Sequence, residues 1–77
     1  MKKIEVLGTG CAKCLKLEEL AKKAVEETGI EAEVIKVKDI NKIMDYGVMT
    51  TPALVVDGEV KSAGKVPLIE DIKNYIK

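Results

Sequence analysis

The stretch Ile4-Glu5-Val6-Leu7-Gly8-Thr9-Gly10-Cys11-Ala12-Lys13-Cys14 joins an apolar run to a pair of cysteines, and a long amphipathic pattern follows it. The apolar run predicts a strand and the amphipathic pattern predicts a helix, so the cysteines stand where a strand turns into a helix. A thiol in the first turn of a helix faces unpaired backbone N–H groups and the positive end of the helix dipole. Both favour the reactive thiolate, and Lys13 adds a positive charge. The stretch therefore predicts a reactive dithiol, Cys11 and Cys14, whose spacing allows an intramolecular disulfide.

Composition indicates one folded domain over residues 1–77. Apolar residues make up 47% of the chain and charged residues 34%, which is typical of a folded domain rather than a disordered one. A length of 77 residues suits a single domain. Because the chain has no Trp and no Phe, its core must consist of Ile, Val, Leu, Ala and Met.

The charge balance argues against nucleic acid or a membrane as partner. The 13 basic residues, all lysine, are matched by 13 acidic residues, so the basic excess that such partners select is missing. No apolar run approaches the length of a membrane span. The basic start, Met1-Lys2-Lys3, precedes an apolar stretch that Glu5 interrupts and that is too short for a signal peptide. We therefore expect a cytoplasmic protein.

The cysteines and the absence of histidine narrow the chemistry. In a reducing compartment, a cysteine pair favours catalysis, redox sensing or metal binding over a structural disulfide. With no His in the chain, Ser-His and Cys-His nucleophile pairs are excluded. A closed Cys/His zinc site needs four ligands, and this chain offers two sulfurs.

Periodicity and turn residues predict a succession of short elements. Gly29 ends the first helix, and Asp39 is expected to cap a short helix that stops at Gly47. The dipeptide Asp57-Gly58 is typical of a two-residue hairpin turn. The predicted elements are a strand over about 2–7, a helix up to 28, a strand over about 31–37, a short helix from 40, strands over 53–56 and 59–63, and a last helix with Pro67 in its first turn that runs to Ile76.

The element order βαβαββα predicts an α/β fold. Strand–helix–strand units imply parallel pairing with right-handed crossovers, and the hairpin adds an antiparallel strand. The expected architecture is a four-stranded mixed sheet with three helices distributed over both faces. The strand over 31–37 is partly polar, which favours an edge position.

This order and two motifs resemble the thioredoxin fold, in particular the small thioredoxin/glutaredoxin-like proteins of archaea and bacteria. One motif is the cysteine stretch 8–14, and the other is the segment 46–60, YGVMTTPALVVDGEV. The resemblance implies that Cys11 is the exposed nucleophile and Cys14 the more buried resolving thiol. It also implies that Pro52 is cis beside the disulfide, and that the backbone of Thr51 pairs with a bound substrate chain.

Three further positions carry expectations from the resemblance. Gly10 stands where thioredoxin has a tryptophan, so it is expected to border the substrate while leaving Cys11 uncovered. Glu5 lies where thioredoxin keeps a buried acid, and it either assists proton transfer to Cys14 or is a partly solvated strand carboxylate. Gly64 stands where glutaredoxins carry a glycine pair that contacts glutathione.

The leading hypothesis is a thiol–disulfide oxidoreductase that uses a Cys11–Cys14 disulfide and no other cofactor. Its expected partners are a disulfide-containing protein substrate and a reductant that is a protein or a small thiol, and we expect a monomer. The first alternative is a Cu(I)-binding module, because two thiolates suit soft metals. Copper metallochaperones, however, run βαββαβ and end in a strand. The second alternative is a redox sensor that docks on one partner through the Cys11 face.

Overall fold

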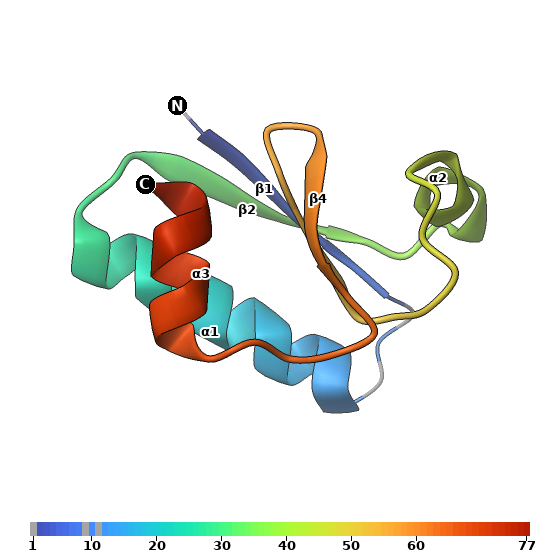
Figure 1. Ribbon diagram of the computed structural model, residues 1–77, viewed down its shortest axis with the longest axis horizontal. Coiled ribbons are helices and arrows are strands. Elements are labelled where there is room, and N and C mark those ends of the chain that lie inside the picture. Colours follow the sequence, from blue (N-terminus) through green and yellow to red (C-terminus); the bar gives the residue numbers. More distant parts are fainter. Residues whose placement is uncertain (1, 9, 11) are drawn as a thin grey trace.

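The computed structural model describes residues 2–8, 10 and 12–77, and within them the chain follows the predicted order βαβαββα (Figure 1). The described elements are β1 (Lys2–Leu7), α1 (Ala12–Thr28), β2 (Ala32–Val37), α2 (Ile40–Asp45), β3 (Ala53–Val56), β4 (Glu59–Ala63) and α3 (Ile69–Ile76). No helix formed by these described residues is long and apolar enough to cross a membrane.

The described strands form one mixed four-stranded sheet in the order β2-β1-β3-β4. β1 pairs parallel to β2, whereas the β1–β3 and β3–β4 pairs are antiparallel. The partly polar strand β2 lies at an edge, as predicted. Leu7 at the end of β1 stands opposite both Val37 and Ala53, and Ala53 stands opposite Ala63. The ends of β1, β2 and β4 and the start of β3 therefore meet at one end of the sheet.

Helices cover both faces of the sheet, which confirms the predicted architecture. On one face, α1 and α3 pack on β1 and β3 around a core of Ile4, Val6, Leu17, Ala21, Ala24, Leu54, Val56, Ile72 and Ile76. On the other face, α2 and the segment that follows it close a smaller core of Leu7, Val37, Ile43, Val48, Ala53 and Val55. Side chains alternate between faces along a strand, so β1 and β3 each supply both cores.

Local signals fix the turns and caps as expected. The Asp39 carboxylate accepts a hydrogen bond of 2.9 Å from Asn41 N and caps α2. Gly29 follows α1 with φ +69°. Asp57 (φ 51°) and Gly58 (φ 84°) form the turn between β3 and β4, where both central residues need a positive φ.

The prediction that Pro67 lies in the first turn of the last helix is wrong. The helix α3 begins at Ile69, and Leu68 is its N-cap residue with extended backbone, φ −70° and ψ 154°. Pro67 therefore lies in the connection from β4, where its side chain is buried. A proline φ near −65° fits extended backbone as well as a helix start, so the residue type alone does not distinguish the two.

Candidate functional site

The candidate site lies at the end of the sheet where α1 begins. Cys11, the predicted nucleophile, lies outside the described residues. Cys14 sits in the first turn of α1 and is buried, with 5% of its surface exposed. Lys13 and Gly10 are both exposed, and Gly10 has φ +97°, a conformation that glycine adopts without strain. Cys14 is thus buried, while its burial relative to Cys11 stays a prediction because Cys11 lies outside the described residues.

Gly8 brings the end of β1 against the thiol of Cys14. A Cβ atom placed on Gly8 would overlap Cys14 Sγ and lie 3.1 Å from Cys14 Cβ. The same position is 3.9 Å from Thr51 Cβ, so three separate segments of the chain converge here. Sequence analysis gave Gly8 no packing role. The only sequence signal for this role is the presence of a glycine between the end of the strand and the cysteines.

Thr51 lies close to Cys14, since both come near the same Cβ position on Gly8, while the packing of Pro52 beside a Cys11–Cys14 disulfide stays a prediction. The Thr51–Pro52 peptide bond is cis; Pro52 is buried and Thr51 is exposed. Gly64 N–H donates a hydrogen bond of 2.8 Å to the Pro52 carbonyl. A Cβ on Gly64 would come within 2.7 Å of Thr50 Oγ1, and Gly64 has φ +76°. Gly64 therefore supports the segment that presents Thr51.

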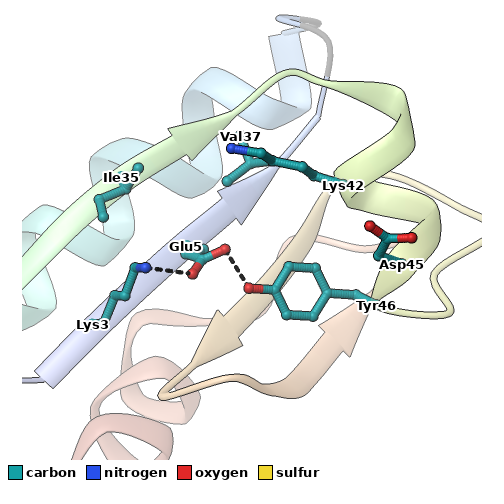
Figure 2. A pocket seen from close by; sticks show the side chains of 7 residues that line it. All are labelled: Lys3, Glu5, Ile35, Val37, Lys42, Asp45 and Tyr46. Atoms are coloured by element: carbon teal, nitrogen blue, oxygen red, sulfur yellow. Dashed lines mark hydrogen bonds and ion pairs between the residues drawn. The ribbon is translucent and has the colours of Figure 1, made fainter.

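Glu5 lies on the opposite face of the sheet from Cys14. Its neighbours on the strand, Ile4 and Val6, face α1, whereas Glu5 lines a pocket of about 350 Å³ next to α2 (Figure 2). Only 7% of its surface is exposed, so the expectation of a partly solvated carboxylate is wrong. Proton transfer from Glu5 to Cys14 stays a prediction.

The partners of Glu5 are a tyrosine and a lysine. Tyr46 Oη donates a hydrogen bond of 2.6 Å to Glu5 Oε2, and Lys3 Nζ lies 3.5 Å from Glu5 Oε1 (Figure 2). The hydrogen bond to the carboxylate raises the pKa of Tyr46 above its usual value, and desolvation adds to the effect. Sequence reasoning found no role for Tyr46, because nothing local connects it with Glu5.

The described residues give no sign of a metal centre. None of their His, Cys, Asp and Glu side chains form a group of three or more that could hold an ion. The order of the described elements ends in α3 and so differs from the βαββαβ order of copper metallochaperones.

The mixed sheet, the thiol at the start of α1 and the cis peptide bond between Thr51 and Pro52 define a protein of the thioredoxin-fold class. A family model described as "Thioredoxin domain" matches residues 2–77. The chain is 46% identical over 76 residues to a thioredoxin of Methanothermobacter thermautotrophicus, a match that covers 99% of each chain. It is also 46% identical over 74 residues to a thioredoxin of Methanocaldococcus jannaschii, covering 96% of this chain and 85% of the relative.

The chain therefore belongs to the thioredoxin family. Thioredoxins are dithiol–disulfide oxidoreductases, and this protein is an enzyme of that class. These comparisons give the Cu(I)-binding alternative no support.

Proposed function

We propose that Cys11 attacks the disulfide of a protein substrate and that Cys14 resolves the resulting mixed disulfide. The observation that carries this proposal is the burial of Cys14 at the start of α1, packed against Gly8 and next to Thr51. A thiol enclosed in this way is poorly placed to meet a large substrate first, which leaves the attack to Cys11. Cys14 then reacts only with the mixed disulfide that Cys11 has already formed.

The reaction proceeds by two exchanges. The Cys11 thiolate forms a bond to one substrate sulfur, and the substrate disulfide breaks to release a thiolate that takes up a proton. The Cys14 thiolate then attacks Cys11 Sγ, forms the Cys11–Cys14 disulfide and releases the second substrate thiolate, which is also protonated. Two electrons pass from the enzyme to the substrate. A dithiol protein or a small thiol must return them, and the Cys11–Cys14 pair is the only redox group required.

Residues next to the two cysteines bind the substrate and stabilise the thiolate. Thr51 is exposed near the thiol, an extended substrate chain can hydrogen-bond to its backbone, and buried Pro52 fixes the direction of that backbone. Gly10 leaves the approach uncovered, and the exposed Lys13 favours the thiolate in the same helix turn. We infer that the protein works as a monomer in the cytoplasm, where thiols are kept reduced.

Single-cysteine variants test the assignment of roles. With a disulfide-containing model protein and excess reductant, Cys11→Ser is expected to show no catalysed reduction. For adduct formation, each variant is reduced first and mixed with the model protein after the free reductant has been removed. Cys14→Ser is then expected to accumulate a covalent mixed disulfide, visible by mass under non-reducing conditions, and Cys11→Ser to form none. Adduct formation by Cys11→Ser but not by Cys14→Ser would reverse the two roles.

The reduction potential tests the redox pair itself. Equilibration in dithiothreitol or glutathione buffers, alkylation and mass analysis should show one two-electron transition between about −200 and −300 mV. Failure to form the intramolecular disulfide under oxidising conditions would contradict the proposal.

A further inference from the structure

A narrow crevice of about 20 Å³ opens beside the thiol, and two lysines border it. Gly8, Gly10 and Cys14 form one part of its lining, and Lys36 and Lys38 form another. Lys36 is on β2 and Lys38 directly follows that strand, so both extend from the sheet edge next to the start of α1. Neither lysine belongs to the motifs that identify the family, and the proposed chemistry uses neither.

The positive charge at this crevice is only partly balanced. Lys36 Nζ lies 3.4 Å from Glu18 Oε2, but Glu18 is shared with Lys22, whose Nζ lies 3.9 Å from Oε1. Lys38 is exposed and takes part in none of the ion pairs formed among the described residues. One carboxylate thus serves two lysines and leaves Lys38 unbalanced by any of these pairs.

The remaining charges near the crevice do not cancel this excess. Lys13, exposed in the first turn of α1, adds to it. Asp39, next to Lys38 in the chain, keeps its negative charge while its carboxylate accepts the backbone N–H of Asn41, so it and Glu18 oppose two of the four charges of Lys13, Lys22, Lys36 and Lys38. A chain of zero net charge therefore carries a local basic surface beside the thiol of Cys14.

Acidic and basic residues are also separated along the edge strand β2. Exposed Glu31 and Glu33 stand at the end of β2 far from the thiol, and exposed Lys36 and Lys38 stand at the near end. Glu33 shares the face of Ile35 and Val37, whereas Lys36 shares the face of Val34 and pairs with Glu18 on α1, so the glutamates of this edge lie away from the thiol in face as well as in position. Acidic and basic residues mixed along the strand would have been enough to keep the protein soluble, so solubility alone does not explain this separation.

We propose that Lys36 and Lys38 form a cationic rim that selects disulfide substrates carrying acidic residues next to the reactive disulfide. This inference rests on the proposed function. Opposite charge raises the frequency and correct orientation of encounters more than it strengthens the final complex. The selectivity therefore resides in kcat/KM and weakens as salt screens the charges.

Three disulfide-bonded peptides of one length test this selectivity, with Glu, Gln or Lys on both sides of the disulfide. The rates are compared at about 0.01 M and about 0.15 M ionic strength, where the Debye length falls from about 30 Å to about 8 Å. For the unmodified protein at the lower salt, we expect kcat/KM for the Glu peptide to exceed that for the Lys peptide about tenfold. In the double variant Lys36→Gln/Lys38→Gln this ratio should fall to within about twofold, while the Gln peptide reacts as before.

The matched control is Lys61→Gln/Lys77→Gln, which removes the same net charge elsewhere. It should keep the preference for the Glu peptide, and circular dichroism verifies that both double variants fold. Equal rates for the three peptides, or equal effects of the two double variants, would overturn the cationic rim while leaving the oxidoreductase activity intact. Reduction of none of the peptides would instead contradict the proposed function, and the inference with it.

Discussion

The hydroxyl of Tyr46 donates a 2.6 Å hydrogen bond to the buried carboxylate of Glu5. Glu5 lies on the central strand β1, and Tyr46 is the C-cap residue of α2. The segment that leads to Thr51 and Pro52 begins directly after Tyr46. The bond therefore anchors the segment that leads to Thr51 and Pro52 to the central strand β1.

Replacement of Tyr46 by Phe should destabilise the protein. The variant keeps the ring but removes the donor, so the buried carboxylate of Glu5 loses a hydrogen bond. We expect the free energy of unfolding to fall by about 1–3 kcal/mol, as for other buried acceptors that lose their donor. Urea denaturation followed by circular dichroism measures the change.

The second tyrosine of the chain supplies the control. Tyr75 on α3 is half-buried, and its hydroxyl takes part in none of the hydrogen bonds among the described residues. Tyr75→Phe should therefore change the free energy of unfolding by less than about 0.5 kcal/mol. Equal effects of the two substitutions would show that the Tyr46–Glu5 bond adds nothing to stability.

Gly8→Ala should be costly because the new methyl group meets the thiol of Cys14. We expect a loss of about 1–3 kcal/mol in the free energy of unfolding, typical of an overpacked site. Under reducing conditions, the same substitution in a Cys14→Ala background should cost less, since the sulfur is gone and only the Cβ contact remains. Identical costs in the two backgrounds would mean that the thiol does not set the requirement for glycine.

Features whose cause lies within a few residues were predictable from the sequence. Asp39 caps α2, Gly29 ends α1 and Asp57-Gly58 turns the hairpin, because each depends on local backbone chemistry. The position of Cys14 in the first helix turn follows from the same kind of pattern. Together with the order of elements, these signals suffice for the fold and for the location of the candidate site.

Features that depend on tertiary contacts were not predictable. Glu5 and Tyr46 are 41 residues apart, and no periodicity links them. The requirement for Gly8 depends on where Cys14 Sγ comes to rest. Pro67 was misplaced for a different reason. The fixed φ of proline is compatible with both a helix start and extended backbone, so the local sequence could not distinguish the two.

Ser62 on β4 offers a substitution that should stabilise the fold. Its buried Oγ has no hydrogen-bond partner among the described residues. Ser62→Ala removes an unsatisfied polar atom and should raise the free energy of unfolding by up to about 1 kcal/mol. Thr28→Val is the contrasting control, because Thr28 Oγ1 donates to the Ala24 carbonyl at 2.9 Å and its removal should lower stability. Destabilisation by both changes would indicate that Ser62 does have a partner.

Asp57 should contribute to the loss of stability in acid. The backbone N–H of Lys3 donates to its carboxylate at 2.9 Å and, with help from Lys2, lowers the pKa of Asp57 below its usual value. Because the unfolded chain binds this proton more readily, the stabilisation is complete above the usual pKa and is lost as the pH falls through the lowered value.

Asp57→Asn should therefore be less stable than the unmodified protein at about pH 6, and the two stabilities should converge toward about pH 2. Asn tolerates the positive φ of this turn, so the substitution tests the charge alone. Glu19→Gln removes an exposed carboxylate outside the ion pairs of the described residues and controls for the change in net charge; convergence in that variant as well would remove Asp57 as the cause.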